Sequence, residues 1–508
     1  MSRGRAGAVA PPVAGGQAAT YVRGMPGDDL PSSTDGPAVV WFRRDLRLDD
    51  HPALLAATGS DGLSGPGPRR VVPLFVIDPA LWDTAGDPRR AWLLRSLRAL
   101  DEHIGGGLVV RRGDPVHVVA EVARETGARE VHVSADYGPY GRRRDAAVAE
   151  ALGAAGVRLV ATGSPYAVGP GTVRNGSGEA YKVFTPFSRE WQRIGWSAPA
   201  VTADGSAGEV TWERLDGRDW PEEPDLGATV LPPVGEAAAH ERWAAFVDER
   251  LTGYAGARDA PAVPGTSAMS AHLKYGEVHP RTLLADLSRL LGDGRLSQAS
   301  RESVETYRTE IAWREFYADV LWTHPGSARE YLRPQLAAMR YDDVGSRTGA
   351  ERLRAWQEGR TGYPFVDAGM RQLRAEAWVH NRVRMVVASF LVKDLHVEWR
   401  HGATFFMQML RDGDIASNSH GWQWVAGSGT DAAPYFRVFN PVTQGQKFDP
   451  DGAYVRRYVP ELAHLPGKKA HAPWESDDGY DHGYPERVVD HAAERVEALA
   501  RLSEVTGG

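Results

Sequence analysis

The feature that most constrains the fold is a change of hydrophobic periodicity partway along the chain. From about residue 37, short apolar runs such as AVVWF, VVPLFVI and EVHVS alternate with helical stretches at 88–104 and 115–127. Short apolar runs are typical of buried strands, and their alternation with helices predicts a doubly wound parallel sheet over residues 37–165. From about residue 241 to 508 the periodicity is helical, which predicts an all-α second domain.

Two segments lie outside these predicted domains. Residues 1–36 are rich in Gly, Pro and Ala and lack the apolar core of a signal peptide, so we expect a disordered tail. Residues 166–240 contain recurrent Gly and Pro, as in GPGTVRNGSG and LPPVGE, with little periodicity. This composition predicts a long linker between the two domains.

Composition excludes several kinds of chemistry. The 508 residues include no cysteine, which excludes disulfides, thiol catalysis and zinc–thiolate sites and suits a cytoplasmic protein. No metal-ligand spacing is present, so we expect no metal. No apolar run reaches the ~18 residues that a membrane span needs, so we expect no membrane contact, and we expect a monomer. The net charge of −7 leaves a local basic patch as the only route to nucleic-acid binding.

Nucleotide-binding loops of the common kinds are missing from the sequence. The first predicted strand is not followed by G-x-G-x-x-G, and G-x-x-x-x-G-K-[ST] occurs nowhere, which argues against a Rossmann dinucleotide site and a P-loop. Tryptophan is instead unusually abundant, with sixteen in the chain and seven between residues 313 and 424. The second domain therefore offers many aromatic faces.

Two stretches of that domain combine hydroxyls or amides with a helix. PGTSAMSAHLKYGEVHP (264–280) opens a helix with hydroxyls that can hold a phosphate, although plain N-capping also explains them. WVHNRVRMVVASFLVKDLHVEWRHG (378–402) places Asn381, Arg384 and Met385 on one helical face. Its remaining residues are apolar enough for a buried helix with one satisfied amide, which is the alternative interpretation.

Two further stretches add charges and rings. ETYRTEIAWREFYADVLW (305–322) is an amphipathic helix with an acid, an arginine and two rings on one face, although an ordinary salt-bridged helix fits as well. DGDIASNSHGWQW (412–424) places Trp422 and Trp424 two residues apart before a Gly-rich turn. In an extended or irregular segment both rings face the same way and can stack a planar ligand or an unstacked base; core packing is the alternative. Together these stretches favour a site for a large planar anionic cofactor over a hydrolase site.

Long ordered motifs then match a known family. They include VVWFRRDLRLDDHPAL, YKVFTPF, WREFY, AWQEGRTGYPFVDAGMRQL, VHNRVRM, SFLVKDL, DGDIASN, GWQW and FNPVTQGQKFDPDGAYVRRYVPEL. The chain resembles DNA photolyases of the cryptochrome/photolyase family over about residues 37–500. Within that family it most resembles the class I cyclobutane-pyrimidine-dimer photolyases.

The resemblance implies a U-shaped FAD in the helical domain. The hydroxyl run from Thr266 to Ser270 would hold the pyrophosphate, and Asn418 would lie near the central-ring nitrogen of the flavin. Arg384 and Asp412 would pair beside the isoalloxazine. The flavin contacts that the resemblance implies are Tyr254, Thr266, Ser267, Ala268, Met269, Ser270, Tyr307, Arg314, Asn381, Arg384, Asp412, Gly413, Asp414 and Asn418.

The resemblance also implies light-driven repair of UV-damaged DNA. Reduced FAD, excited by light, would pass an electron to a flipped-out pyrimidine dimer, whose poor stacking makes flipping easier, and the electron would return after the ring opens. The lesion contacts it implies are Trp313 and Trp424 as sandwiching walls, Glu310 and Asn381 as hydrogen-bonding partners, Met385 as a packing contact, and Arg258 and Arg382 on the DNA backbone.

One part of the family pattern is missing from this chain. Photolyases re-reduce oxidised flavin through tryptophans, of which Trp422 matches the member nearest the flavin and Trp399 the middle one. The position of the outer tryptophan falls at Ser346, which cannot donate an electron. The terminal donor is then predicted to be Tyr341, with Asp342 or Asp343 accepting its proton, or Trp356.

The antenna and the exact family branch rest on fewer residues. Gly138 stands where folate-binding members have an acid, and PYGRRRD is similar to deazaflavin binders, so we expect 8-hydroxy-5-deazaflavin in preference to 5,10-methenyltetrahydrofolate. The alternative function is a blue-light receptor without repair activity. Asn418, where plant cryptochromes have Asp, and the absence of a long C-terminal tail favour repair. A generic FAD oxidoreductase lacks support because no nicotinamide motif is visible.

Overall fold

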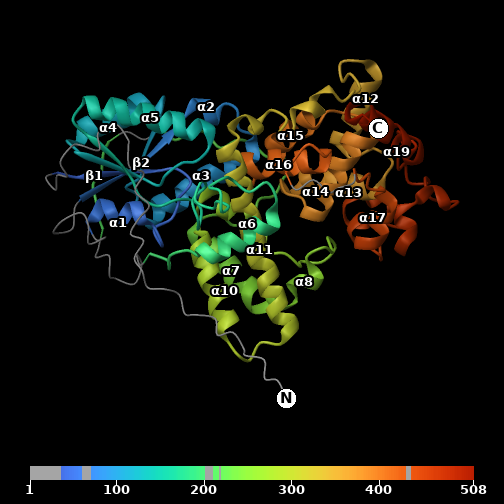
Figure 1. Cartoon of the computed structure of the whole chain (residues 1–508), viewed down its shortest axis with the longest axis horizontal. Helices are drawn as coiled ribbons and strands as arrows, with labels where there is room; N and C mark the ends of the chain where they lie inside the picture. Colours follow the sequence, from blue (N-terminus) through green and yellow to red (C-terminus); the bar gives the residue numbers. More distant parts are fainter. Residues whose placement is uncertain (1–35, 60–69, 201–209, 217–218, 431–435, 508) are drawn as a thin grey trace.

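A sheet domain and a helical domain make up the computed structural model, which describes residues 36–59, 70–200, 210–216, 219–430 and 436–507 (Figure 1). The tail predicted over 1–36 lies, apart from Gly36, outside the described residues. No helix within these ranges has both the length and the apolar character needed to cross a membrane.

The N-terminal domain is built on a parallel sheet with its five main strands in the order β3-β2-β1-β4-β5. Ala38 of β1 lies opposite Val71 of β2, and Val39 lies opposite Val131 of β4. The chain thus starts in the middle of the sheet and winds outward to both edges, which confirms the doubly wound α/β prediction. The strands are β1 (Ala38–Phe42), β2 (Arg70–Ile77), β3 (Val109–Arg112), β4 (Glu130–Val133) and β5 (Arg158–Ala161).

Successive residues of β1 point to opposite faces of this sheet. Val40 and Phe42 join one hydrophobic core, and Val39 and Trp41 join the other. A strand buried on both faces reads as an uninterrupted apolar run, which is why AVVWF is recognisable in the sequence. The helices are α1 (Pro52–Thr58) and α3 (Asp87–His103) on the first face and α4 (Pro115–Thr126) and α5 (Pro139–Ala154) on the second (Figure 1).

The segment predicted as a linker over 166–240 contains regular structure. Helix α6 (Phe184–Ile194) packs on the helical domain, where the indole N–H of Trp191 donates to Glu315 at 2.6 Å. A short strand, β6 (Thr211–Trp212), pairs in parallel with β2. The segment therefore connects the domains and also adds to the core of each.

The C-terminal region is helical, as predicted (Figure 1). Its longer helices are α7 (Glu236–Glu249), α10 (Pro280–Gly292), α11 (Gln298–Thr323), α12 (Arg347–Glu358), α13 (Pro364–Glu376), α14 (Asn381–Ser389), α15 (Trp399–Met409), α16 (Ile415–Ala426), α17 (Pro441–Phe448) and α19 (His491–Thr506). Shorter helices are α8 (Tyr254–Ala257), α9 (Ser270–Tyr275) and α18 (Ala453–Tyr458).

The stretch 378–402, interpreted as one buried helix, is divided into three pieces. Helix α14 is followed by a π-helical turn over Phe390–Asp394, then by an irregular segment, and α15 begins only at Trp399. Within the irregular segment His396 adopts a left-handed backbone conformation with φ of 52°. The single-helix interpretation is therefore wrong beyond Ser389, and Trp399 begins a separate helix.

The two domains meet at the end of α9. Gly276 ends α9 with φ of 69°, and a Cβ added there would lie 1.9 Å from the carbonyl oxygen of Arg44 in the loop after β1. Only glycine permits so close an approach of the two backbones. The guanidinium of Arg44 in turn donates to Asp414 at 2.9 Å. The loop after β1 is thus fixed against the residues predicted to bind the cofactor.

Candidate functional site

The centre of the site is a buried ion pair between α14 and the loop before α16. Arg384 donates to one carboxylate oxygen of Asp412 at 2.8 Å, and Ser270, at the start of α9, donates to the same oxygen at 2.6 Å. Burial alone would raise the pKa of Asp412, but Arg384 and Ser270 bring it below its ordinary value. Asp412 is therefore a fixed anion held by two separate helices, α14 and α9.

The other oxygen of Asp412 provides a test of whether a ligand fits here. This Oδ1 atom is buried and has no hydrogen-bond partner among the described residues. A buried carboxylate oxygen without a donor is costly, so it indicates a place for a ligand that brings an O–H or N–H group. The residues present thus fit a hydroxyl-rich or amide-bearing cofactor.

A second carboxylate connects the site to the sheet domain. Asp414 caps α16 by accepting from the backbone N–H of Ser417 at 3.1 Å, and its other oxygen pairs with Arg44. Burial would raise the pKa of Asp414, but Arg44 and Arg314 keep it below its ordinary value. Gly413, between the two acids, has little room for a side chain because an added Cβ would lie 3.2 Å from Met407 Sδ.

Lys274 belongs to this cluster, although its sequence context does not mark it as functional. Burial and the neighbouring Arg89 and Arg44 hold the pKa of Lys274 well below its ordinary value. Its ammonium lies 3.6 Å from the centre of the Tyr275 ring. A concentration of cationic groups next to α9 suits an anionic ligand such as a pyrophosphate.

The hydroxyl groups of the run Thr266 to Ser270 have different partners, with Ser267 bound to Tyr307 and Ser270 bound to Asp412. Helix α9 begins at Ser270 and its N-cap residue Met269 makes no side-chain cap, so the plain N-capping alternative is not what the structure shows. Ser267 instead shares a 2.9 Å hydrogen bond with the hydroxyl of Tyr307, and Ala268 adopts a left-handed φ of 52°. Thr266 and Ala268 are half-buried, and Ser270 is exposed beside Asp412.

The remaining predicted flavin contacts lie around this centre. Tyr254 packs edge-to-face on Tyr307, with ring centroids 5.2 Å apart. Arg314 donates to the backbone carbonyls of Pro165 and Leu273 at 3.1 and 3.2 Å, so it joins the start of the linker to α9. Asn418 donates to the carbonyl of Ala403 at 3.0 Å, which leaves its own amide oxygen as an acceptor.

The predicted lesion contacts form two ion pairs around the start of α14. Arg258 binds Glu310 at 2.7 Å, and Arg382 binds Asp259 at 2.9 Å. Burial raises the pKa of Glu310, and Arg258 opposes that rise. Asn381, the first residue of α14, is exposed. Both predicted phosphate-binding arginines are thus already paired with carboxylates.

Met385 lies one turn further along α14. Its sulfur is 3.5 Å from the guanidinium of Arg382. Arg382 and Met385 thus lie on the side of the helix where lesion contacts are predicted. Arg384, predicted to share a face with Met385, reaches Asp412 instead. Helix α14 therefore contributes to both halves of the candidate site.

Trp313 is held rigidly by an aromatic neighbour from the linker. Its ring stacks on Phe184 of α6, with centroids 3.6 Å apart and an angle of 8° between the planes. Tyr317, one turn along α11, stacks on His420 of α16 at 5.7 Å. The helix predicted over 305–322 is confirmed, and its aromatic face packs against both α6 and α16.

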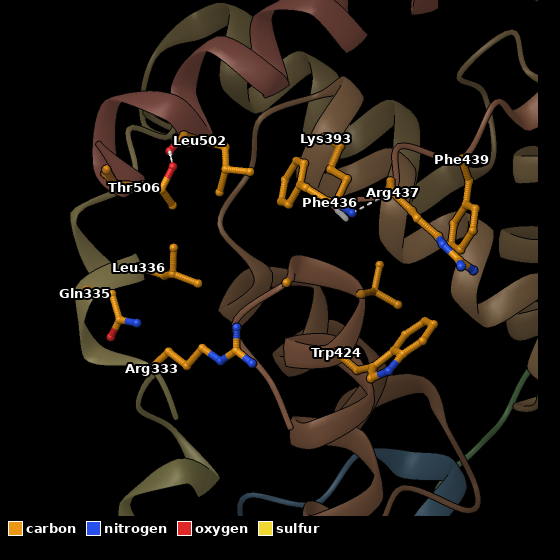
Figure 2. A pocket seen from close by; sticks show the side chains of 13 residues that line it. Arg333, Gln335, Leu336, Lys393, Trp424, Phe436, Arg437, Phe439, Leu502 and Thr506 are labelled. Atoms are coloured by element: carbon orange, nitrogen blue, oxygen red, sulfur yellow. Dashed lines mark hydrogen bonds between the residues drawn. The ribbon is translucent and has the colours of Figure 1, made fainter. Parts of the chain in front are cut away.

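The expectation that Trp422 and Trp424 lie in an extended or irregular segment is wrong. Both belong to α16, where residues two apart point in nearly opposite directions. Trp422 is buried against Phe406 and Trp356, at 5.1 and 6.1 Å between ring centroids. Trp424 is half-buried and lines a pocket of about 430 Å³, which Figure 2 shows from close by. The two rings therefore lie in different environments and cannot both stack on one ligand.

The predicted electron-transfer residues differ in their surroundings. Ser346, the position of the missing outer tryptophan, is the N-cap of α12 and accepts from the N–H of Gly349 at 3.1 Å. Trp356 is fully buried and donates to the carbonyl of Val387 at 3.0 Å. Trp399 is buried and packs on Tyr331, a residue that the sequence motifs do not single out, with ring centroids 5.8 Å apart.

Gly138, the basis of the antenna prediction, is the N-cap of α5, and its N–H donates to Asp136 at 3.0 Å. Asp136 also binds Arg144 of the PYGRRRD run at 3.1 Å. The start of α5 is thus bound to the end of the sheet by buried charges.

Comparisons with known proteins agree with this geometry. Residues 38–203 match the family model described as DNA photolyase, and residues 307–504 match the FAD binding domain of DNA photolyase. Deoxyribodipyrimidine photo-lyases from Halobacterium salinarum and Escherichia coli are 38% and 39% identical to this chain, over 92% of it and 99% of their own lengths.

A solved structure shows the same arrangement. A bacterial class III photolyase from Agrobacterium tumefaciens is 36% identical, with a TM-score of 0.83, over 95% of this chain and all of that one. The class I placement remains a prediction, because a class III enzyme is among these relatives. Since family models and relatives agree over both domains, the chain belongs to the DNA photolyase/cryptochrome family.

Proposed function

We propose that this chain uses light to reopen cyclobutane pyrimidine dimers in DNA. The observation that carries the proposal is the double role of α14. Arg384 on this helix reaches the buried carboxylate of Asp412, and Arg382 and exposed Asn381 lie with the Arg258–Glu310 pair. A cofactor beside Asp412 and a base beside Asn381 would then be close enough for direct electron transfer.

On the cofactor side, the chain holds groups that suit FAD. The unpartnered oxygen of Asp412 would accept from a flavin hydroxyl or N–H, and the amide oxygen of Asn418 is a further acceptor. Ser270, Thr266 and the neighbouring Lys274 would hold the pyrophosphate. Bound and fully reduced, FAD supplies the electron that opens the dimer when light excites it.

On the lesion side, the chain's residues would orient a flipped dimer. Trp313, made rigid by Phe184, and Trp424 would provide the aromatic walls. Glu310 and Asn381 would hydrogen-bond the base edges. Arg258 and Arg382 would exchange their carboxylate partners for DNA phosphates, which gains affinity only at low and moderate salt.

A repair assay tests the proposal. Protein with chemically reduced flavin should restore thymine dimers in an oligonucleotide under near-UV or blue light and should leave them intact in the dark. Repair of (6-4) products alone would contradict the class I reading. Binding of flavin without any repair would instead favour the blue-light receptor.

A matched pair of variants tests the role of Glu310. Glu310→Gln removes the charge and keeps the shape, so flavin content should be normal while repair per absorbed photon falls. Arg258→Met breaks the same ion pair but keeps the carboxyl group. It should lower DNA affinity and preserve the repair yield of bound dimers. Equal yields in the two variants would remove Glu310 from the site.

We also propose 8-hydroxy-5-deazaflavin as the antenna chromophore, on the strength of Gly138 and the PYGRRRD run at the start of α5. The absorption spectrum of protein purified from a deazaflavin-producing host tests this. A folate spectrum, or flavin absorption alone, would contradict it.

We further propose that the enzyme acts as a monomer in the cytoplasm. The absence of cysteine suits a reducing compartment. Light scattering that gives a stable dimer would contradict the monomer.

A further inference from the structure

Trp422 packs against α15, the helix that begins at Trp399, and Trp399 in turn contacts Tyr331. The ring edge of Trp422 is held tightly against Gly402 of α15, where an added Cβ would lie 2.2 Å from it. Trp399 begins the same helix one turn earlier and contacts Tyr331 edge-to-face at 5.8 Å. A hole on Trp422 therefore has two tryptophan neighbours: Trp356, whose ring centroid is 6.1 Å away, and Trp399, which lies one turn from the Gly402 contact and leads on to Tyr331.

Tyr331 has the partner that an oxidised tyrosine needs. Its hydroxyl donates to the carboxylate of Glu398 at 2.9 Å, and Glu398 is 26% exposed at its side chain. Burial, neighbouring Tyr341 and Glu398 all raise the pKa of Tyr331, so the phenol is neutral until it is oxidised. Arg400 binds Glu398 at 3.0 Å, and its guanidinium lies 5.2 Å from the centre of the Tyr331 ring. The proton that Glu398 accepts can therefore pass to solvent at this partly exposed ion pair.

Trp399 favours this transfer because it has no proton acceptor. Its indole N–H is buried and has no hydrogen-bond partner in the described part of the chain. An oxidised Trp399 would therefore keep its proton and remain a strong oxidant for Tyr331. A neighbouring acceptor would instead have trapped the hole as a neutral indole radical.

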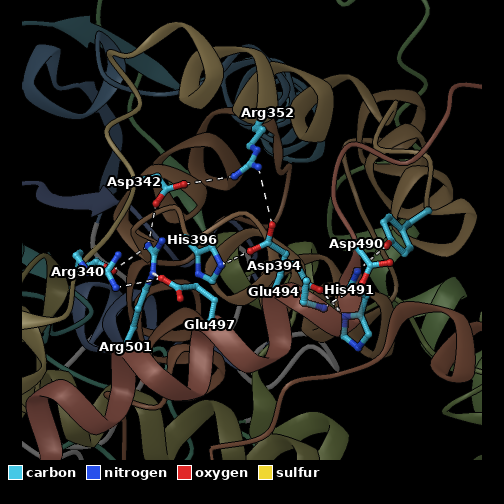
Figure 3. A network of polar contacts seen from close by, with 12 residues as sticks. Arg340, Asp342, Arg352, Asp394, His396, Asp490, His491, Glu494, Glu497 and Arg501 are labelled. Atoms are coloured by element: carbon cyan, nitrogen blue, oxygen red, sulfur yellow. Dashed lines mark hydrogen bonds and ion pairs between the residues drawn. The ribbon is translucent and has the colours of Figure 1, made fainter.

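The two donors predicted from the sequence are less suitable. Trp356 is 0% exposed and its N–H is bound to a backbone carbonyl, which cannot take the proton. The hydroxyl of Tyr341 is buried next to that of Tyr331. Its expected acceptor, Asp342, pairs with two arginines, Arg501 at 2.8 Å and Arg352 at 3.4 Å, as Figure 3 shows. Among the described residues, Glu398 pairs with Arg400 alone and already accepts a hydrogen bond from Tyr331.

We infer that Tyr331 is the terminal electron donor and that Glu398 accepts its proton. Tyr331 gives one electron to the Trp399 cation radical and its phenolic proton to the Glu398 carboxylate. The products are neutral Trp399, a neutral Tyr331 radical and protonated Glu398, and an external thiol reduces the radical. The inference rests on the proposed function, because a bound, light-excited oxidised flavin must first take an electron through Trp422.

Flash photolysis with electron paramagnetic resonance tests the donor. Wild-type protein should show a tyrosyl radical, and Tyr331→Phe should lack it and photoreduce roughly tenfold more slowly. Glu398→Gln keeps the packing and should slow radical formation while removing the effect of D₂O on its rate. Tyr341→Phe and Trp356→Phe are the matched controls and should keep the signal. A wild-type signal in Tyr331→Phe, or its loss in Tyr341→Phe, would overturn the inference.

A flavin-free measurement tests the hydrogen bond itself. In protein labelled with 3-fluorotyrosine, the ¹⁹F resonance that disappears in Tyr331→Phe should resist ionisation at high pH and shift in Glu398→Gln. An unchanged resonance in Glu398→Gln would contradict the Glu398 contact. Repair by chemically reduced wild-type protein separates the two proposals, since a tyrosyl radical without repair would refute only the repair function.

Discussion

Replacing Gly402 by alanine should displace Trp422 and destabilise the helical domain. An added Cβ would lie 2.2 Å from Cη2 and 2.5 Å from Cζ3 of Trp422, and 2.6 Å from Leu391 Cδ2. Such overpacking costs about 1–3 kcal/mol, and two rigid neighbours place this site at the upper end. The better helix propensity of alanine offsets about 1 kcal/mol. A net loss of about 2 kcal/mol is therefore expected.

Gly292→Ala is the matched control because it lies at the end of α10, where an added Cβ would meet nothing within 4 Å. Its unfolding free energy should stay within about 0.5 kcal/mol of wild type. Urea unfolding followed by near-UV circular dichroism measures both variants, and blue-light bleaching of oxidised flavin measures photoreduction. If Gly402→Ala unfolds like Gly292→Ala and photoreduces at the wild-type rate, the packing of Trp422 on α15 is not what delivers the electron.

Three other changes probe separate parts of the site. Trp424→Ala should weaken binding of damaged DNA by roughly tenfold, because one base–ring stack contributes about 1–3 kcal/mol, while flavin content stays normal. Unchanged affinity in a filter-binding assay would assign Trp424 to packing alone. Arg384→Met should lower the free energy of unfolding by about 3 kcal/mol at pH 7, because Asp412 is left buried and charged. This loss should shrink as the pH falls and Asp412 is protonated. An equal loss at pH 5 and pH 7 in unfolding experiments would refute this. Burial lowers the pKa of Lys393 to about 7 in the folded protein. Above pH 7 the folded state has therefore lost a proton that the unfolded chain keeps, so the free energy of unfolding should rise with pH. Lys393→Met should abolish that rise in thermal melts between pH 7 and 9.

Local sequence patterns predicted those strands and helices whose buried residues recur with a regular spacing or form an unbroken apolar run. Buried parallel strands are apolar throughout, and α11 repeats its apolar residues with helical spacing, so both were recognisable. Helix α6 places Phe184, Phe187 and Trp191 at helical spacing on one buried face, but it lies in a segment whose recurrent Gly and Pro predicted a linker, so its local pattern was overlooked. The segment around Trp422 was misjudged because its helix depends on the Asp414 cap and on packing against α15.

For the predicted cofactor-binding residues, too, the sequence identifies motif residues but not the contacts between distant parts of the chain. The resemblance names Arg384, Asp412 and Ser270, and the structure brings all three together. Lys274 and Tyr331 were not predicted: Lys274 lies in the stretch 264–280 but outside its hydroxyl run, Tyr331 lies in no motif, and each becomes meaningful only through neighbours distant in the chain. Tyr331 meets Glu398 across 67 residues, a contact that no periodicity reports.

The break after α14 explains why that contact exists. The π-helical turn over Phe390–Asp394 carries two buried polar side chains, and each is bound by another part of the chain: Lys393 donates to the carbonyl of Arg437, and Asp394 pairs with His491. These partners compensate for leaving the regular helix, and π-turns of this kind often occur at functional sites. Had the helix continued, Glu398 and Trp399 would extend along the axis of α14. Because it ends, Trp399 can begin α15 and contact Tyr331, and the electron path depends on contacts that only the folded chain provides.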